Sequence, residues 1–327
     1  MFASNHTFAG TSVNLNTARF FNLSNTTRIR EVAKIELSDR SYLPKVGDPR
    51  SDWVASVAVP AFQALAQAGV EAPNFCSIGT GAGLDALAAI EILNARNVFV
   101  TDLHDDVVTL AHENIVNNVA NGSEVTVAAG VGDLLSPIIG KNLDLDLLYE
   151  NLPNIPMSEN ENLYDGQTSS TFIKQRGEQI PDFIRRYLVE LHYVALRQAF
   201  PLLKSGGRAL SSIGGRIPLD VIVQIGRNLG YRSQILTFTW KIQSEPAEVI
   251  GGYAQWEKQG FGPFRFYPAE VLAETFSAVA DVASGARVRQ IELSLFSHEM
   301  SATSALAAMS AGVSVGHTVA ILESLKP

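Results

Sequence analysis

The sequence predicts an α/β protein built on a doubly wound, mostly parallel sheet of seven strands. From residue 75 onward, short apolar runs alternate with amphipathic segments of helical length, as in parallel βαβ units with right-handed crossovers. The runs are apolar almost throughout, which is typical of strands covered by helices on both faces. Hydrophobic residues make up 46% of the 327 residues, which is enough to build a packed core.

The first segment, residues 1–70, is expected to form a helical cap or lid over the core. Its first thirty residues are rich in Asn, Thr and Phe and show little periodicity. Between Asp52 and Ala68, apolar residues recur at steps of three and four, which predicts an amphipathic helix interrupted or begun near Pro60. Gly69 is expected to end this helix.

The core is expected to occupy residues 71–242 and to be completed by a last strand in 313–327. Residues 243–312 break the alternation and are predicted to be an insertion or substrate cap before that strand. In chain order the predicted elements are strand 75–79, helix 84–95, strand 98–102, helix 105–118, strand 125–131, strand 145–153, helix 181–200, a fifth strand within KSGGRALSSIGG, helix 218–229, strand 231–242 and strand 317–325.

Composition excludes several classes of protein. The formal net charge of −8 argues against a nucleic-acid partner, because phosphate binding needs clustered Lys and Arg. A single cysteine rules out an internal disulfide and a thiolate zinc cage, and the six histidines show no metal-ligand spacing. No signal-peptide pattern and no run of about 18 apolar residues occurs. We therefore expect a cytoplasmic protein without a metal or a membrane partner.

A glycine-rich loop follows the first strand of the alternation. Gly79, Gly81 and Gly83, with Thr80 between them, would let the backbone turn sharply and let a ligand approach the main chain. Leu84 stands where a dinucleotide fingerprint needs its third glycine, and no lysine follows the loop as a P-loop requires. The loop is therefore predicted to bind neither a dinucleotide nor a triphosphate, and a plain tight turn is the alternative.

Two carboxylates follow the next two strands of the predicted sheet. Asp102 ends the second strand, where it can accept the two hydroxyls of a ribose, and Leu103 follows it. Asp133 lies just past the third strand, where it can accept from an adenine amino group. Each has a local alternative, namely a helix N-cap for Asp102 and a turn cap for Asp133.

Five motifs in this order resemble the class I S-adenosylmethionine (SAM) methyltransferases. They are GTGAG after the first strand, Asp after the second, GDLL after the third, Asn-x-Pro after the fourth and LLKSGGRAL before the fifth. The resemblance covers about residues 70–242. It implies an enzyme whose cofactor is SAM, with the glycines around its amino acid part. The predicted cofactor-binding residues are Gly79, Thr80, Gly81, Gly83, Asp102, Leu103, Asp133 and Asn151.

The segment Asn151-Leu152-Pro153-Asn154 ends the fourth strand. It looks like the Asn-Pro-Pro-Tyr motif of amino-methylating members such as release-factor glutamine and adenine-N6 methyltransferases, whose Asn side chain and next carbonyl accept hydrogens from the substrate nitrogen. Methyl transfer cancels the charge on sulfur, so alignment and proximity should supply most of the rate. Leu152 and Asn154 depart from the motif, which argues against a purine or glutamine acceptor. A proline-stopped strand is the alternative.

Further site residues come from the same edge of the predicted sheet. The catalytic candidates are Asn151, Tyr149 and Tyr187, and the substrate-binding candidates are Leu152, Pro153, Tyr164 and His192. Ordinary packing is the alternative for the aromatic residues, and His192 is either a general base or a packed histidine. The stretch GGYAQWEKQGFGPFRFY is a lid, a contact of a homodimer or the core of a small subdomain.

The predicted function is methyl transfer from SAM to a nitrogen of a small molecule, of the kind found in secondary metabolism. The alternative is a resemblance to azetidine-2-carboxylate synthases, in which the amine of SAM closes a four-membered ring and methylthioadenosine leaves. Asn151 and Tyr187 would then orient that amine. An NAD(P) oxidoreductase, which Leu84 disfavours, and a non-catalytic SAM-binding module complete the alternatives.

Overall fold

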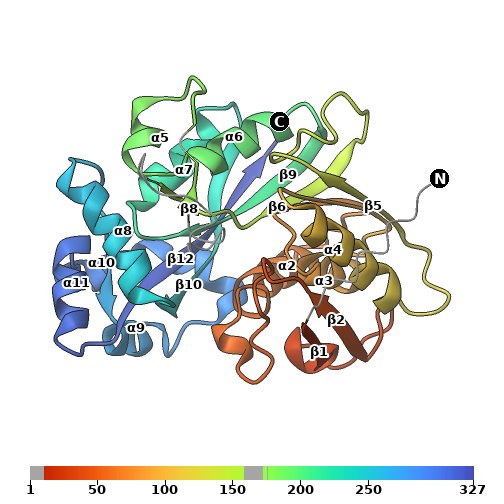
Figure 1. Cartoon of the computed structure of the whole chain (residues 1–327), viewed down its shortest axis with the longest axis horizontal. Helices are drawn as coiled ribbons and strands as arrows, with labels where there is room; N and C mark the ends of the chain where they lie inside the picture. Colours follow the sequence, from red (N-terminus) through yellow and green to blue (C-terminus); the bar gives the residue numbers. More distant parts are fainter. Residues whose placement is uncertain (1–10, 158–171, 175) are drawn as a thin grey trace.

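The computed structural model describes residues 11–157, 172–174 and 176–327, and a seven-stranded path in the order β10-β12-β9-β6-β3-β4-β5 runs through its centre (Figure 1). The strands are β3 (Asn74–Ile78), β4 (Asn97–Asp102), β5 (Thr126–Val131), β6 (Leu145–Glu150), β9 (Leu203–Gly214), β10 (Arg232–Ile242) and β12 (Val315–Leu325). Only the pairings of β12 with β9 and β10 along this path are antiparallel. The predicted doubly wound, mostly parallel sheet is confirmed, and a short strand, β11 (Tyr267–Pro268), joins it beside β12.

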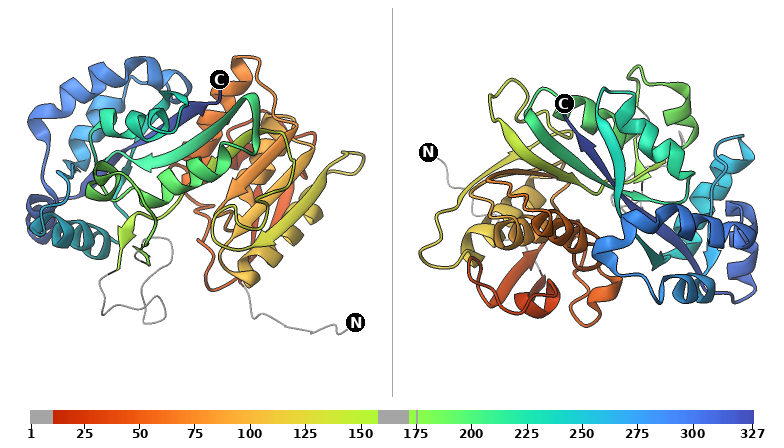
Figure 2. Two further views of the ribbon diagram at one scale, coloured as in Figure 1. Left: turned by 90° about the horizontal axis from the view of Figure 1, so that it is seen from above. Right: turned by 180° about the vertical axis from the view of Figure 1, so that it is seen from behind.

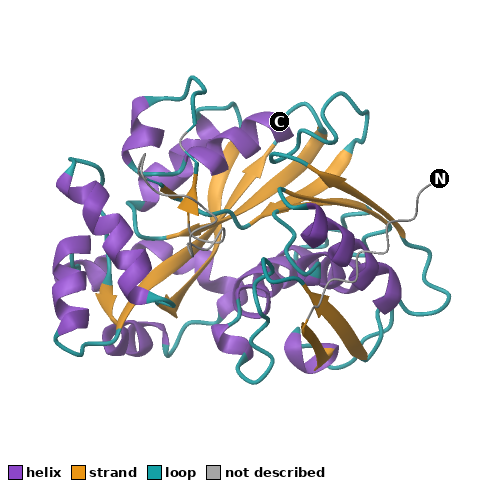
Figure 3. Ribbon diagram, viewed as in Figure 1, coloured by secondary structure: helices purple, strands orange, loops and turns teal. Residues whose placement is uncertain are grey.

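Helices cover both faces of the sheet (Figure 3). They include α2 (Val59–Gln67), α3 (Leu84–Ile92), α4 (Asp105–Asn118), α6 (Glu190–Ala199) and α7 (Leu219–Arg227). Neighbouring strand residues alternate between two cores: Leu148 packs in the core that contains α6, whereas Leu147 and Tyr149 pack in the one that contains α2 and α3. Burial on both faces explains why the strands read as continuous apolar runs.

The parallel strands bring the predicted site residues to one edge of the sheet. The loop after β3 is tied to β4, because the amides of Gly79 and Thr80 both donate to Thr101 O, at 2.8 and 3.2 Å. The loop after β5 is tied to the end of β4 by a hydrogen bond from Gly132 N to Asp102 O, at 2.9 Å. The carboxyl ends of these strands therefore form one continuous edge, where ligands of open α/β sheets bind.

The N-terminal segment is not wholly helical, contrary to the prediction of a helical cap. It contains an antiparallel pair, β1 (Thr11–Asn16) and β2 (Val32–Leu37), with α1 (Thr17–Phe20) between them. Asn114 and Asn118 of α4 accept from the backbone of β2, at Glu36 N (2.8 Å) and Lys34 N (3.1 Å). Two side chains of α4 thus accept the backbone hydrogen bonds of this strand. The strand could not be predicted from local periodicity, because these partners lie far away in sequence.

The helix predicted near Pro60 is present and begins with a short π-helical turn. Several other short elements lie in the loops. A π-helical turn, η2 (Val54–Ala58), leads directly into α2. The other short elements are η1 (Pro49–Ser51), η3 (Asp281–Arg287), η4 (Phe296–His298) and the parallel pair β7 (Ile155–Pro156) and β8 (Phe172–Ile173). No helix in the described ranges is both long enough and apolar enough to span a bilayer.

The long helix predicted for 181–200 is broken in two. It forms α5 (Asp182–Arg186) and α6, because Leu188 takes a left-handed conformation with φ 56°. Arg186 is held from both sides by Gly262, whose amide donates to Arg186 O and whose carbonyl accepts from Arg186 Nε, each at 2.8 Å. The first part therefore turns toward the loop after α8, while α6 packs on the sheet.

Four helices lie between β10 and β12 in sequence and beside that end of the sheet (Figure 2). They are α8 (Pro246–Lys258), α9 (Ala269–Phe276), α10 (Val288–Leu295) and α11 (Ala302–Ser310). The aromatic stretch packs among them: the rings of Tyr253 and Phe264 are 4.8 Å apart, and Phe266 is fully buried. These aromatic residues belong to the same buried core as Leu148 and α6, and the three roles that the sequence leaves open for the stretch stay predictions.

A candidate SAM site at the carboxyl edge of the sheet

The glycine loop after β3 has a backbone that other residues adopt only with strain. Gly79, Gly81 and Gly83 have φ values of 65°, 52° and 80°, all in the left-handed region. A Cβ on Gly83 would lie 3.0 Å from Ile115 Cγ1, whereas one on Gly81 would meet nothing within 4 Å. The loop is therefore packed against α4 on one side and open at Gly81, which fits a ligand lying along the main chain.

A buried carboxyl group, Asp85, lies beneath this loop. It accepts hydrogen bonds from Ser77 Oγ, from Ala86 N at 2.8 Å and from Thr80 Oγ1 at 3.4 Å. Burial raises the pKa of Asp85 to about 6, although these bonds act in the opposite direction. Asp85 is not among the predicted site residues. The feature that points to it in the sequence is an acidic residue in the otherwise apolar first turn of a buried helix.

Replacing Asp85 by Asn is expected to change how stability depends on pH. The pKa of Asp85 is higher in the folded state, so between about pH 6 and 4 that state binds more protons and the wild type gains stability as pH falls. The difference in unfolding free energy between Asp85→Asn and wild type should shift by about 2 kcal/mol between pH 4.5 and 7.5, in favour of the variant at high pH. Urea unfolding at both pH values measures it, and a pH-independent difference would contradict the prediction.

Asp102 lies at the end of β4 beside the glycine loop. Its Oδ2 accepts from Gly81 N at 3.3 Å and its Oδ1 from His104 N at 3.4 Å, both long for hydrogen bonds. His104, and not Asp102, is the N-cap residue of α4, and no side chain caps that helix. Burial raises the pKa of Asp102. This weakly bonded carboxyl group is therefore available for a ligand, and Leu103 beside it is 55% exposed.

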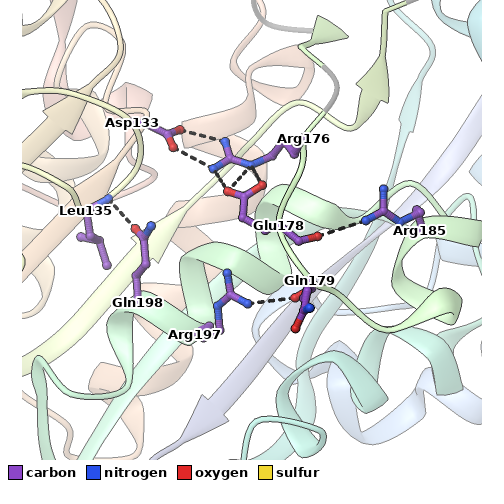
Figure 4. Close-up of polar contacts among 8 residues, drawn as sticks. All are labelled: Asp133, Leu135, Arg176, Glu178, Gln179, Arg185, Arg197 and Gln198. Carbon is purple, nitrogen blue, oxygen red and sulfur yellow. Dashed lines mark hydrogen bonds and ion pairs between the residues drawn. The ribbon is translucent and has the colours of Figure 1, made fainter.

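Asp133, just past β5, forms an ion pair in this structure (Figure 4). Its two oxygens accept from Arg176 Nη1 and Nη2 at 2.9 and 2.7 Å, and Arg176 also contacts Glu178. Sequence reasoning missed Arg176, which shares no local pattern with Asp133. A carboxylate has about four lone-pair sites, so this pairing leaves Asp133 able to accept from an adenine amino group as well. That role stays a prediction.

The Asn151–Asn154 segment lies against the glycine loop. A Cβ on Gly79 would be 3.2 Å from Leu152 Cδ2 and 3.9 Å from the carbonyl oxygen of Asn151. Asn154 Oδ1 is buried and has no hydrogen-bond partner among the described residues. Pro153 lies between Leu152 and Asn154, and the chain then enters β7. The structure thus brings the predicted acceptor segment next to the predicted cofactor loop.

Tyr149 lies in the core and not at the edge of the sheet. Its ring packs edge-on against Phe62 of α2, with centroids 5.4 Å apart, and only 2% of its surface is exposed. Burial raises the pKa of Tyr149 well above its ordinary value. Because β6 is buried on both faces, its alternate side chains enter the two cores, and the structure gives no support to a catalytic role for Tyr149.

His192 of α6 pairs with a carboxylate that sequence reasoning missed. Its Nδ1 lies 2.8 and 2.9 Å from the two oxygens of Glu150, and neither residue has any exposed surface. His192 Nε2 is also buried, with no partner in the described part of the chain. Glu150 immediately precedes Asn151, so the pair supports the end of β6. The sequence feature that could have predicted this pair is an acidic residue, Glu150, within a strand that is buried on both faces.

Two further predicted residues have different outcomes. Tyr187 is half-buried at the end of α5, with the Arg186 guanidinium 5.9 Å from its ring centroid. Tyr187 and Glu190 do not lie on one continuous helix, because the predicted helix breaks at Leu188. Tyr164, the other predicted aromatic of the site, lies outside the described residues.

Two curated relatives match part of the chain. No family model matches. The ribosomal protein L11 methyltransferase of Lactobacillus johnsonii is 35% identical over 101 residues, which are 30% of this chain and 32% of that protein. The enzyme of the same name from Lactobacillus gasseri is 36% identical over 94 residues, 28% of this chain and 30% of that protein.

The match spans about a third of the length of these curated relatives. Among solved structures, the ribosomal protein L11 methylase of Lactobacillus delbrueckii subsp. bulgaricus is 23% identical, covers 55% of this chain and 70% of its own, and has a TM-score of 0.36. The predicted resemblance is confirmed by the two sequence relatives: the chain is a relative of the class I SAM-dependent methyltransferases, transferases whose cofactor is S-adenosylmethionine.

Proposed function

We propose that this protein binds SAM at the carboxyl edge of its sheet and transfers the methyl group to a nitrogen of a small molecule. The observation that carries the proposal is the contact between the Asn151–Leu152 segment and the glycine loop at Gly79. A group held by Asn151 would lie beside a cofactor held by that loop. Reaction rates depend strongly on such proximity and alignment.

The residues of the edge have separate tasks in this proposal. SAM, when bound, supplies an electrophilic methyl group on a sulfonium. The open side of the loop at Gly81 would hold its amino acid part, and Asp102 would accept from its ribose hydroxyls. Asn151 accepts a hydrogen bond from the N–H of the acceptor and so directs the nitrogen lone pair, and after methyl transfer the nitrogen releases its extra proton to water. No charge has to be created in this step, so the chain needs to align the groups and exclude water.

A small acceptor is supported by the helix that covers the end of β6. Gly252 of α8 lies so close to Ile155 that a Cβ there would be 3.1 Å from Ile155 Cδ1, and Trp256 Nε1 donates to Pro156 O at 3.0 Å. The relatives named for ribosomal protein L11 suggest a protein acceptor instead. A helix packed on the chain that follows Asn151 leaves less room for a folded protein than for a small molecule.

Incubation of the pure protein with SAM alone, followed by mass spectrometry, tests the proposal. Methyl transfer predicts no turnover until an acceptor is added, and then adenosylhomocysteine. Methylthioadenosine formed without any acceptor would contradict methyl transfer and support the alternative, closure of SAM to azetidine-2-carboxylate. Binding of SAM without either product would indicate a non-catalytic module.

Replacing Asn151 by Ala is expected to lower kcat by about a hundredfold, because the acceptor nitrogen loses the group that aligns it. The Kd for SAM should stay within about twofold, since the loop and Asp102 are unchanged. Asn97→Ala is the matched control, because Asn97 begins β4 at the opposite edge of the sheet. Steady-state kinetics and calorimetric titration measure the two quantities. Equal losses in kcat and SAM affinity would contradict the assignment.

A further inference from the structure

A buried arginine lies at the same edge of the sheet, just after β9, the strand that pairs with β6. Arg216 is 7% exposed. Its Nε and Nη2 donate to Gln243 Oε1 at 3.2 and 2.7 Å, and Nη2 lies 2.9 Å from His317 Nε2. The guanidinium carbon is 5.3 Å from the ring centroid of Tyr253. All of these partners are uncharged groups.

A second cation, Lys241, lies on the other side of His317. Lys241 on β10 and His317 on β12 are cross-strand partners. Lys241 Nζ donates to Ser56 Oγ at 3.0 Å and to Asp52 O at 3.1 Å, and it lies 5.2 Å from the ring centroid of Trp53. Burial lowers the pKa of Lys241 to about 8. The hydrogen-bond acceptors of Lys241 are neutral, and the carboxylates of Asp52 and Asp48 act on it from nearby and favour its charged form.

Arg216 carries a positive charge that no carboxylate of the described residues neutralises, whereas Lys241 lies near the carboxylates of Asp52 and Asp48. Burial, Arg216 and Lys241 hold the pKa of His317 well below its usual value, so His317 is neutral. No carboxylate of the described part of the chain lies within ion-pair distance of Arg216 or Lys241. A buried cation without a counter-charge is unfavourable, and an anionic ligand would relieve that cost.

The local sequence is built around this guanidinium. A Cβ on Gly214 would overlap Arg216 Nη1, so a larger residue there would push the guanidinium out of its present position. Burial by itself would favour an apolar residue at the end of an inner strand. A buried arginine beside a glycine that leaves it space therefore indicates a functional role for Arg216.

The helix α8 joins this cluster to the proposed acceptor segment. Tyr253 covers Arg216, while its neighbours Gly252 and Trp256 contact Ile155 and Pro156. These two residues directly follow Asn154, whose Oδ1 is buried without a partner among the described residues. Arg216 and the Asn151–Asn154 segment therefore lie at neighbouring parts of one edge, because they follow the adjacent strands β9 and β6.

We propose that Arg216, surrounded by Gln243, His317 and Tyr253, binds a carboxylate group of the acceptor molecule. The parallel donors Nε and Nη2, which now meet Gln243 Oε1, match the two oxygens of a carboxylate, and the ligand would take the place of the Gln243 amide oxygen. The inference rests on the proposed function and adds to it that the acceptor amine also carries a carboxylate. The competing explanation is structural, with Arg216 only tying the ends of β10 and β12 together through Gln243 and His317.

The test uses acetate as a carboxylate probe on the full-length protein. The melting temperature is measured in roughly 100 mM sodium acetate and in sodium chloride of equal ionic strength, and we expect acetate to raise it by about 2 °C more. In Arg216→Gln this extra shift should disappear, because the variant loses the charged donor fork. Arg289→Gln, which removes an exposed arginine paired with Asp220, is the control and should keep the shift.

A shift that is equal in wild type and Arg216→Gln, or no shift in wild type, would overturn the assignment. If Arg216→Gln does not fold, Arg216→Lys replaces it, because lysine keeps the charge and loses the planar fork; the acetate shift should then fall by about half or more. A purely structural role for Arg216 changes the melting temperature of the variants in both salts alike and leaves the difference between the salts unchanged.

Calorimetric titration with SAM separates the two sources of a carboxylate. The acceptor assignment predicts that Arg216→Gln binds SAM within about twofold of wild type. A loss of about tenfold or more would mean that Arg216 holds the carboxylate of SAM itself, which overturns the assignment to the acceptor. Failure of the wild type to bind SAM would instead contradict the proposed function, whatever acetate does.

Discussion

His192→Ala is expected to lower the free energy of unfolding by about 3–5 kcal/mol, the usual loss when one partner of a buried pair is removed. The substitution leaves Glu150 with no exposed surface and without its hydrogen-bond partner. It also opens a cavity between α6 and β6, which adds to the loss. Urea unfolding measures the effect, and His298→Ala, at an exposed position, serves as the control.

Adding Glu150→Gln to His192→Ala should recover part of this loss, because an amide is easier to bury unpaired than a carboxylate. The double-mutant cycle then isolates the coupling between the two residues. A loss below about 1 kcal/mol in the single variant would contradict the view that this pair supports the end of β6. Because Glu150 directly precedes Asn151, the loss of its partner His192 should also lower kcat.

Asp102→Ala is expected to weaken SAM binding by about a hundredfold. In the proposed site Asp102 accepts from two ribose hydroxyls, and hydrogen bonds to a charged group contribute about 1.5 kcal/mol or more each. Its bonds within the protein, to Gly81 N and His104 N, are long, so stability should change little. Calorimetric titration gives the Kd, and thermal unfolding without SAM checks the fold.

Asp105→Ala is the matched control for this prediction. Asp105 is exposed at the start of α4 and carries the same charge three residues away. Its variant should bind SAM like the wild type. If Asp102→Ala kept wild-type affinity while Asp105→Ala lost it, the site would lie on the helix and the assignment of the β4 end would be wrong.

Most of the sheet could be predicted because its strands have a local signature. Runs such as 98–102 and 145–150 are mostly apolar, since helices cover both faces, and each ends at an acidic residue. The break at Leu188 could not be predicted in this way. The apolar residues of 181–200 fit one continuous helix, and the break follows from contacts with Gly262, which lies far away in sequence.

The candidate site divides in a similar way. Gly79, Gly81 and Asp102 were predicted from their positions after strands, and the structure brings them to one edge. The burial of Tyr149 against Phe62 could not be predicted, because its neighbourhood in sequence says only that it is near the strand end. Which of two adjacent residues enters which core depends on how the strand is oriented between its helices.

By itself, the sequence determined the alternation of strands and helices, the glycine loop and the order of the motifs. Those features depend on residue type and on spacings of a few residues. Only the tertiary structure decided the pairing of Glu150 with His192, 42 residues apart, and the contact of Arg216 with His317, 101 residues apart. Such partners meet because strand order and helix packing bring them together, and burial then favours the polar groups that find one another.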